Sequence, residues 1–224
     1  MKVSFYTLGC KVNLYETEVV INSFKKKGYE IVDFNDLADI VVINTCTVTN
    51  NSDKKSRNII RQAVKNNKNA IIVVMGCYSQ VRVDEIKEID GVNIVIGNTN
   101  KSKVVELVEE YIKSNKNITL VEDIMNTTFE PMILDSFETK TRAFVKIQEG
   151  CNNFCSYCII PYARGNIRSK CKEDVIKEVT CLTNNEYKEV VLTGIHTGHY
   201  GKERFDYDFS DLLSELSQIK IYIG

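Results

Sequence analysis

The chain has 224 residues, of which 43% are hydrophobic and 26% are charged, a composition typical of globular domains rather than disordered or fibrous chains. The formal net charge is −1, so affinity for nucleic acid would have to come from a local basic patch. No apolar run approaches the ~18 residues of a membrane span, and the N-terminal apolar run is too brief for a secretion signal. We therefore expect a cytoplasmic protein with no membrane partner.

Strand-like and helix-like segments alternate along the first half of the chain. The apolar periodicity predicts strands at residues 3–8, 40–43, 70–75 and 94–96, and helices at residues 13–27, 52–66 and 101–114. Asn13 followed by Glu16 resembles a capping box, which predicts that the first helix begins there. Such alternation indicates an α/β fold with an open parallel sheet and flanking helices. We assign residues 1–116 to this N-terminal domain.

A polar segment separates this domain from a second alternation. Residues 117–141 contain Pro131 and are expected to form a linker or an edge hairpin. The pattern beyond them predicts strands at 143–147, 189–193 and 219–223, and helices at 172–184 and 209–218. Because one βα unit takes about 30 residues, residues 142–224 suffice for roughly two and a half units. We therefore expect only the first units of a partial (β/α) barrel.

The chain has eight cysteines, which in a reducing compartment favour metal binding or catalysis over a disulfide framework. Three of them each lie just after a predicted strand: Cys10, Cys46 and Cys77. In a parallel sheet these positions share one edge, where such folds bind ligands, and the neighbouring helix N-termini would favour thiolates. One such cysteine would be read as a small apolar filler. The three together favour a three-thiolate cluster site.

The other notable set lies in the stretch "EGCNNFCSYCIIP", with the spacing C-x3-C-x2-C: Cys151, Cys155 and Cys158. Three thiolates can bind three irons of a [4Fe–4S] cluster and leave the fourth iron open. Zinc normally requires a fourth ligand, which His196 or His199 could supply across the fold, so zinc is the minor alternative. Tyr157 precedes the last cysteine, where its ring could pack beside a ligand of the open iron.

Several longer stretches resemble a known family. "FVKIQEGCNNFCSYCIIPYARGNIRS" resembles the cluster loop of radical S-adenosylmethionine enzymes, in particular the methylthiotransferases. "TLGCKVNLYETE", "INTCTVTNNSDKKSR" and "MGCYSQ" resemble the three cysteine motifs of the N-terminal domain of that family. The "GCKVN" form, "KIQEGC" and "LTGIHTGHYG" are most similar to the branch that modifies threonylcarbamoyladenosine in tRNA. Residues 142–224 would then begin a radical S-adenosylmethionine barrel.

The resemblance implies two [4Fe–4S] clusters and S-adenosyl-L-methionine as cofactors. The loop cysteines would hold the cluster that binds S-adenosylmethionine and cleaves it to a 5′-deoxyadenosyl radical. The strand-end cysteines would hold an auxiliary cluster that delivers a methylated sulfur. The product would be a methylthio group at C2 of N6-threonylcarbamoyladenosine next to the anticodon. The implied electron donor is a flavodoxin or ferredoxin, and the cofactors carry the difficult chemistry.

The resemblance also implies contacts to S-adenosylmethionine from further residues: Tyr157, Arg164, Gly194, Ile195 and His196. Tyr157 would lie near the adenine, and the 194–196 backbone would bind the methionine amino end. His196 is equally well explained as an ordinary loop residue. Arg164 and Arg168 would bind cofactor or RNA phosphate, or be solvated loop charges. Two cysteines match no ligand position and are expected to be free thiols: Cys171 and Cys181.

A basic cluster follows the second strand-end cysteine: Lys54, Lys55, Arg57 and Arg61. The ordinary interpretation is a solvated helix face, and the functional one is a surface that faces anionic tRNA. An enzyme that modifies an adenine in an anticodon loop would need that base splayed into its pocket.

The resemblance also implies a remaining barrel portion and a C-terminal RNA-binding domain, neither of which follows Gly224 in this sequence. A partial barrel exposes strand edges, so we expect this chain alone to be aggregation-prone and inactive. One alternative within the class is a methylthiotransferase for isopentenyladenosine in tRNA or for a ribosomal protein. The alternative from another class is a non-catalytic iron–sulfur protein for electron transfer or cluster assembly.

Overall fold

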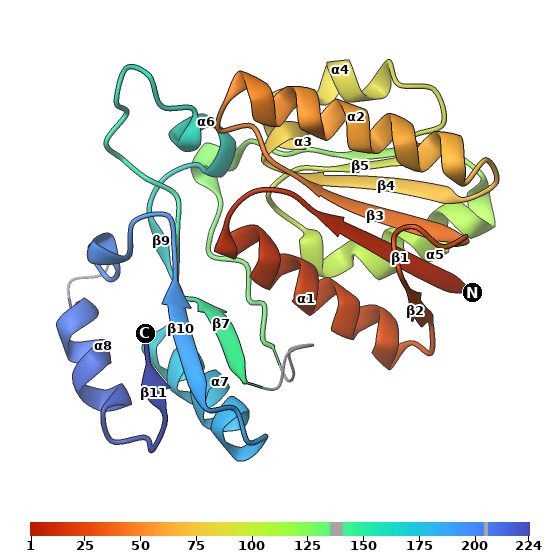
Figure 1. Cartoon of the computed structure of the whole chain (residues 1–224). Helices are drawn as coiled ribbons and strands as arrows, with labels where there is room; N and C mark the ends of the chain where they lie inside the picture. Colours follow the sequence, from red (N-terminus) through yellow and green to blue (C-terminus); the bar gives the residue numbers. More distant parts are fainter. Residues whose placement is uncertain (135–140, 204–205) are drawn as a thin grey trace.

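A computed structural model describes residues 1–134, 141–203 and 206–224 of the chain. Its larger sheet has six parallel strands in the order β2-β1-β3-β4-β5-β6 (Figure 1). The strands are β1 (Lys2–Thr7), β2 (Glu30–Val32), β3 (Ile40–Thr45), β4 (Ile71–Gly76), β5 (Ile94–Ile96) and β6 (Ile118–Leu120). The sheet confirms the predicted open parallel α/β architecture.

Helices cover both faces of this sheet (Figure 1). They are α1 (Lys11–Lys26), α2 (Asn50–Asn66), α3 (Cys77–Val81), α4 (Val83–Lys87), α5 (Val104–Ser114) and the 3-10 turns η1 (Lys101–Lys103) and η2 (Ile124–Asn126). Successive side chains of a strand point to opposite faces. Ile40 and Val42 therefore share a core with α1 and α5, whereas Val41 and Ile43 share one with α2, α3 and α4.

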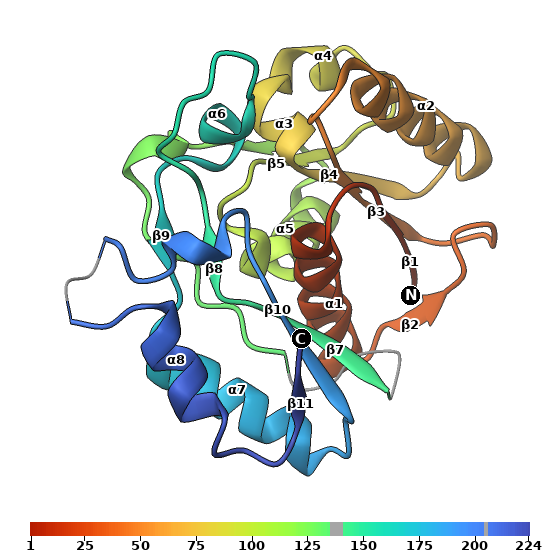
Figure 2. The same cartoon turned by 60° about the vertical axis from the view of Figure 1, so that its left-hand side comes forward.

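The second unit is a smaller parallel sheet in the order β11-β10-β7, as expected for the first units of a (β/α) barrel (Figure 2). Its elements are β7 (Arg142–Lys146), α7 (Lys172–Asn184), β10 (Glu189–Thr193), η3 (Thr197–His199), α8 (Phe209–Leu216) and β11 (Tyr222–Ile223). A two-stranded antiparallel ribbon of β8 (Gln148–Glu149) and β9 (Arg168–Ser169) closes the loop that contains the cysteines and α6 (Ile160–Arg164).

Helix α1 joins the two units. It packs against β1 of the large sheet and against β7 of the small one. One continuous apolar core accordingly includes Tyr15 and Val19 of α1, Val42 of β3 and Val145 of β7. The loop after β8 is therefore held in a defined position relative to the large sheet.

Several boundaries differ from the sequence prediction. Helix α1 begins at Lys11 with Cys10 as its N-cap, so the prediction that Asn13 caps it is wrong. Strand β6 adds an edge to the large sheet within the expected linker, of which residues 135–140 lie outside the described part of the chain. Several short elements were not predicted, among them β2, β8, β9 and α3, because so few residues carry little readable periodicity. In the described residues, no helix combines the length and apolar character needed to cross a membrane.

Candidate functional site

The three strand-end cysteines lie at the switch point of the large sheet. The chain leaves β1 for β2 on one side and then returns to β3 on the other, and open α/β sheets bind ligands at such a reversal. Cys10 caps α1 after β1, Cys46 directly follows β3, and Cys77 begins α3 after β4. Because β1, β3 and β4 are neighbours, all three cysteines share one sheet edge, as the sequence predicts.

Two glycines let the backbone pass closely at this edge. A Cβ on Gly9 would lie 3.0 Å from Cys46 Cβ and 3.1 Å from Cys46 Sγ. Gly76 has φ 106° and ψ −160°, a conformation essentially restricted to glycine, and a Cβ there would lie 2.4 Å from Asn44 Oδ1. The residues before Cys10 and Cys77 therefore need to be glycine for the strand ends to approach one another.

Asn13 ties two of the strand ends together. Its Nδ2 donates to the carbonyl oxygens of Leu8 at 2.7 Å and Thr45 at 3.0 Å, and its Oδ1 accepts a 3.8 Å contact from Cys10 Sγ. This buried side chain fixes the end of β1 against the end of β3. Its use as a bridge explains why it does not act as the helix cap.

Burial, hydrogen bonds and the other two strand-end cysteines act on the Cys46 thiol. Burial raises the pKa of Cys46, hydrogen bonds from the Val48 backbone and the Ser52 side chain lower it, and Cys77 and Cys10 raise it further. The pKa of Cys46 is raised because burial outweighs the two hydrogen bonds. The cationic iron core of a bound cluster would favour the thiolate.

The loop cysteines occupy an exposed segment with firmly held ends. The Cys151 backbone N–H donates to the Gly165 carbonyl at 3.0 Å, and that of Cys158 donates to the Cys155 carbonyl at 2.8 Å. Gly150 has φ 73°, and a Cβ there would lie 1.9 Å from the Asn166 carbonyl oxygen. Cys155 is exposed while the other two thiols are half-buried. The loop thus presents its cysteines outward from a closed base.

Aromatic side chains gather on this loop. Tyr157 is 90% exposed, which leaves its ring accessible to a ligand. Phe154 and Tyr162 form an edge-to-face pair with ring centroids 5.9 Å apart. The ring of Tyr157 is therefore available for the adenine contact that the resemblance implies, and that role stays a prediction.

The loop after β10 is attached to the base of the cysteine loop by Gln148. This fully buried side chain accepts the His196 backbone N–H at 2.8 Å and donates to the carbonyls of Glu149 and Gly150, both at 2.8 Å. A Cβ on Gly194 would lie 2.9 Å from Gln148 Oε1. Sequence reasoning missed Gln148, although its place directly before "EGC" could have suggested a role. Ile195 is half-buried and the His196 side chain is exposed.

The two cysteine sets lie on neighbouring elements. Helix α3, which begins with Cys77, packs against α6, which begins two residues after Cys158 (Figure 2). Asn98 strengthens this contact, since its Nδ2 donates to the Ala163 carbonyl at 2.6 Å and its backbone N–H donates to Gln80 of α3 at 2.9 Å. Strand ends and loop are thus parts of one region.

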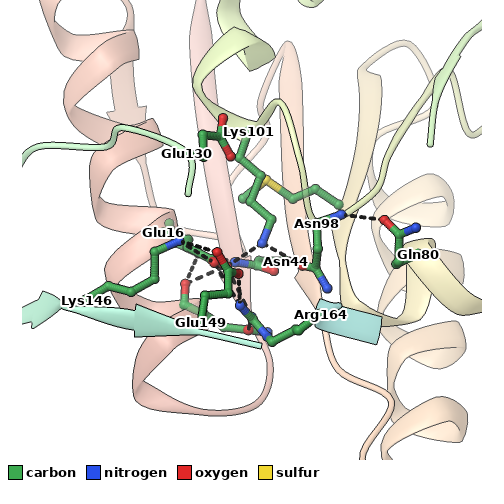
Figure 3. Close-up of polar contacts among 12 residues, drawn as sticks. Glu16, Asn44, Gln80, Asn98, Lys101, Glu130, Lys146, Glu149 and Arg164 are labelled. Carbon is green, nitrogen blue, oxygen red and sulfur yellow. Dashed lines mark hydrogen bonds and ion pairs between the residues drawn. The ribbon is translucent and has the colours of Figure 1, made fainter. Parts of the chain in front are cut away.

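Arg164 and Arg168 are not solvated loop charges, because they are 0% and 6% exposed. They belong to a cluster of ionised side chains between the two units, which we call the buried ion network (Figure 3). Its members are Glu16, Lys101, Lys146, Glu149, Arg164 and Arg168. The sequence carries no local sign of this network because its members are up to 152 positions apart. The amino groups of Arg164 donate hydrogen bonds to Glu16, Glu149 and Asn13, and its expected role toward a cofactor or RNA stays a prediction.

Each cysteine set offers three thiolates, which is the number that a four-iron cluster takes when one of its irons stays open. Within the described residues, no three Cys, His, Asp or Glu side chains form a group that could hold a single metal ion. The rings of His196 and His199 stack on each other with centroids 3.7 Å apart.

The basic cluster on α2 is only partly available. Lys54, Lys55 and Arg61 are exposed, whereas Arg57 donates to the Tyr78 hydroxyl at 2.8 Å and to Glu85 at 3.1 Å. A pocket of about 390 Å³ lies beside it, lined by Asn50, Asn51, Asp53, Lys54, Arg57, Arg82 and Glu85. The remaining thiols lie where the sequence predicts, Cys171 before α7 and Cys181 inside it.

Known proteins resemble this chain over nearly its full length. Residues 2–97 match the family described as uncharacterized protein family UPF0004. The threonylcarbamoyladenosine tRNA methylthiotransferase MtaB of Bacillus subtilis is 51% identical over 215 residues, which cover 96% of this chain and 48% of that protein. MtaB of Aquifex aeolicus is 43% identical over 225 residues, covering 98% of this chain and 54% of that protein.

A solved structure shares the fold. The radical S-adenosylmethionine methyltransferase TsrM from Kitasatospora setae superposes with a TM-score of 0.59 at 14% identity, covering 97% of this chain and 51% of that chain. The chain spans about half the length of the curated relatives that it matches. Across almost all of its residues, the chain is similar to methylthiotransferases of the MtaB type.

Proposed function

We propose that this chain carries the two iron–sulfur sites of a radical S-adenosylmethionine tRNA methylthiotransferase that modifies C2 of N6-threonylcarbamoyladenosine. The observation that supports it best is the packing of two three-cysteine sets against each other through α3 and α6. The names of the B. subtilis and A. aeolicus relatives support the choice of substrate. The corresponding domains would be residues 1–116 and 142–224, joined by the linker 117–141.

The loop after β8 would bind the radical-generating cluster through Cys151, Cys155 and Cys158. With an open iron, that cluster supplies reductive cleavage of S-adenosylmethionine when it is bound. The chain itself would position the groups that bind S-adenosylmethionine. Gln148 holds the backbone of Gly194, Ile195 and His196 beside the loop, where its polar groups would bind the methionine end. The exposed ring of Tyr157 would pack beside the adenine.

The sheet edge would bind the auxiliary cluster through Cys10, Cys46 and Cys77. Burial of Cys46 and Cys77 limits access of water to this site, which suits a sulfur donor that must react only with its intended substrate. The tRNA would approach over the exposed basic side chains of α2. A cytoplasmic flavodoxin or ferredoxin would supply electrons.

Anaerobic reconstitution with iron and sulfide tests the two-cluster proposal. The chain should bind about eight irons, and electron paramagnetic resonance of the reduced protein should change when S-adenosylmethionine is added. An unresponsive spectrum would instead indicate a non-catalytic iron–sulfur protein. About four irons per chain would overturn the two-cluster arrangement.

The substrate is tested separately by mass analysis of tRNA nucleosides. Cells that lack the gene should lose the methylthio group on threonylcarbamoyladenosine and keep the one on isopentenyladenosine. Loss of the isopentenyladenosine derivative, or of a modification on a ribosomal protein, would move the substrate to the corresponding alternative.

A further inference from the structure

Arg164 contacts both carboxylates of the buried ion network, Glu16 and Glu149 (Figure 3). One Arg164 amino group donates to Glu16 at 3.0 Å and to Glu149 at 2.6 Å, and the other donates to Asn13 at 2.5 Å. Glu16 and Asn13 belong to α1 beside the strand ends, whereas Glu149 precedes the cysteine loop. Arg164 therefore connects the surroundings of both sets.

Arg164 also reaches the strand-end cysteines themselves. Asn13 Oδ1 accepts a hydrogen bond from an Arg164 amino group, and the same oxygen accepts the 3.8 Å contact from Cys10 Sγ. Helix α6, which ends with Arg164, packs against α3, which begins with Cys77. Arg164 is thus linked to Cys10 through Asn13 and lies on a helix that packs against the helix of Cys77.

One buried donor of Arg164 is left over. Its Nε has no hydrogen-bond partner within the described part of the chain, although the side chain is 0% exposed. Buried polar groups normally find partners, so such an atom calls for an explanation. An N–H directed toward thiolate or sulfide sulfur would be satisfied when a cluster is bound, and hydrogen bonds to sulfur are one determinant of cluster potentials.

The charges of the network are not balanced. It has four cationic side chains, Lys101, Lys146, Arg164 and Arg168, and two carboxylates, Glu16 and Glu149. The half-buried Glu130 adds attraction to Lys146 and offsets part of the excess. Burial of unpaired charge is unfavourable, so an excess of positive charge is expected to have an anionic partner. A thiolate-ligated cluster at the adjacent sheet edge would be that partner.

We propose that Arg164 is a positioning residue that holds a positive charge beside the auxiliary cluster, raises its reduction potential and links it to the loop that carries the other cluster. This inference rests on the proposed function, because it requires a cluster on Cys10, Cys46 and Cys77. The reduced cluster bears one more negative charge than the oxidised one. A fixed nearby cation therefore favours reduction, and more strongly in a buried site than in water.

Two substitutions that change the local charge in opposite directions test the proposal. Arg164→Met removes one positive charge and leaves Glu16 paired with Lys101 and Lys146. Glu16→Gln removes one negative charge with little change of shape. A perturbation of packing alone would move the potential without regard to the sign of the charge removed.

The measurement is a redox titration followed by electron paramagnetic resonance. The reconstituted 224-residue chain carries alanine at Cys151, Cys155 and Cys158, so that only the auxiliary cluster contributes. Arg164→Met should shift the midpoint potential downward, Glu16→Gln should shift it upward, and Arg164→Lys should restore most of the wild-type value. The matched control is Lys170→Met, which removes a buried cation paired with Glu178 and should leave the potential unchanged.

The outcomes separate this inference from the proposed function. Failure of the alanine-substituted chain to bind about four irons would overturn the two-cluster proposal and this inference with it. Normal loading with unchanged potentials in Arg164→Met and Glu16→Gln would overturn the inference alone. Shifts of the midpoint potential in the same direction in both variants would also overturn the inference alone. If Arg164→Met does not fold, the direction of the Glu16→Gln shift decides.

Discussion

The two cysteine sets are built in different ways. The strand-end set takes its geometry from the register of three parallel strands, and two of its members, Cys46 and Cys77, are buried. The loop set takes its geometry from a spacing of eight residues in an exposed segment whose ends are joined by the β8–β9 ribbon. A buried site is shaped by tertiary packing and fixed charges, whereas an exposed loop is shaped by its own short sequence. This difference predicts that substitutions in the surrounding structure affect the first set more than the second.

Removal of each set separately should produce the largest effects. Replacing Cys10, Cys46 and Cys77 by alanine should lower the iron content from about eight to about four and leave the spectroscopic response to S-adenosylmethionine intact. Replacing the three loop cysteines should lower iron equally but abolish that response. Replacement of Cys171 and Cys181 serves as the control and should change neither quantity. Equal responses from both triple variants would remove the distinction between the two sets.

Gly76 should be far less replaceable than Gly28, which also has a positive φ. Gly76→Ala places a Cβ 2.4 Å from Asn44 Oδ1 at a backbone conformation with φ 106°, so we expect destabilisation by about 2–3 kcal/mol and displacement of Cys77. Gly28, with φ 82°, has nothing within 4 Å of its Cβ position, so Gly28→Ala should cost only about 1 kcal/mol.

Denaturant unfolding measures the free energy of unfolding of both glycine variants. Iron binding by the loop set in the folded protein tests whether the effect is confined to the sheet edge. Gly76→Ala should impair loading of the strand-end set and spare the loop set. Equal free energies of unfolding for the two variants would mean that the close approach at the sheet edge has no energetic consequence.

The buried ion network should make the chain sensitive to acid. Burial alone would raise the pKa of Glu16, but Arg164, Lys101 and Lys146 lower it well below its ordinary value, and Lys146 and Arg164 lower that of Glu149 against the same effect of burial. The unfolded chain therefore takes up protons at these groups first. Their contribution to stability is complete above about pH 5 and declines as the pH falls through about 4.

Urea unfolding between pH 3 and 7 would measure this dependence, with the range taken as roughly that in which glutamates titrate. Glu16→Gln should flatten the acid limb. Glu178 is the control, because burial raises its pKa although Lys170, Leu134 and Tyr15 oppose the effect. The contribution of Glu178 to stability therefore declines as the pH rises. An acid limb that is as steep in Glu16→Gln as in wild type would contradict the assignment.

Tyr157→Ala should have the smallest effect on stability, within about 0.5 kcal/mol, because the ring is 90% exposed. It should weaken binding of S-adenosylmethionine to the reconstituted loop cluster by the loss of a stacking contact. Tyr157→Phe keeps the ring and should bind as wild type does. Isothermal titration calorimetry would measure the affinity of wild type, Tyr157→Ala and Tyr157→Phe for S-adenosylmethionine. Equal affinity of all three proteins would remove Tyr157 from the proposed site.

Regular elements with a strong apolar period were predictable from the sequence. Helix α7 and strand β10 occur at the predicted bounds, and β5 does as well. The short ribbon strands were missed, since hydrogen bonds between distant segments create them. Helix α3 was missed because five residues are too few to show a helical period. Asn13 was misjudged for a related reason. Its side chain serves the carbonyls of two strand ends, one of which is 32 positions away.

The sequence by itself determined the α/β alternation, the cysteine spacing of the loop and the placement of three further cysteines at strand ends. These follow from local periodicity and from the rule that parallel strands share an edge. Only the tertiary structure decided that Arg164 and Arg168 are buried, that Gln148 holds the loop after β10, and that α6 packs against the helix of Cys77. The physical reason is that the burial of a charged side chain leaves no periodic pattern in the surrounding sequence. Whether such a side chain is solvated or enclosed depends on which distant elements pack around it.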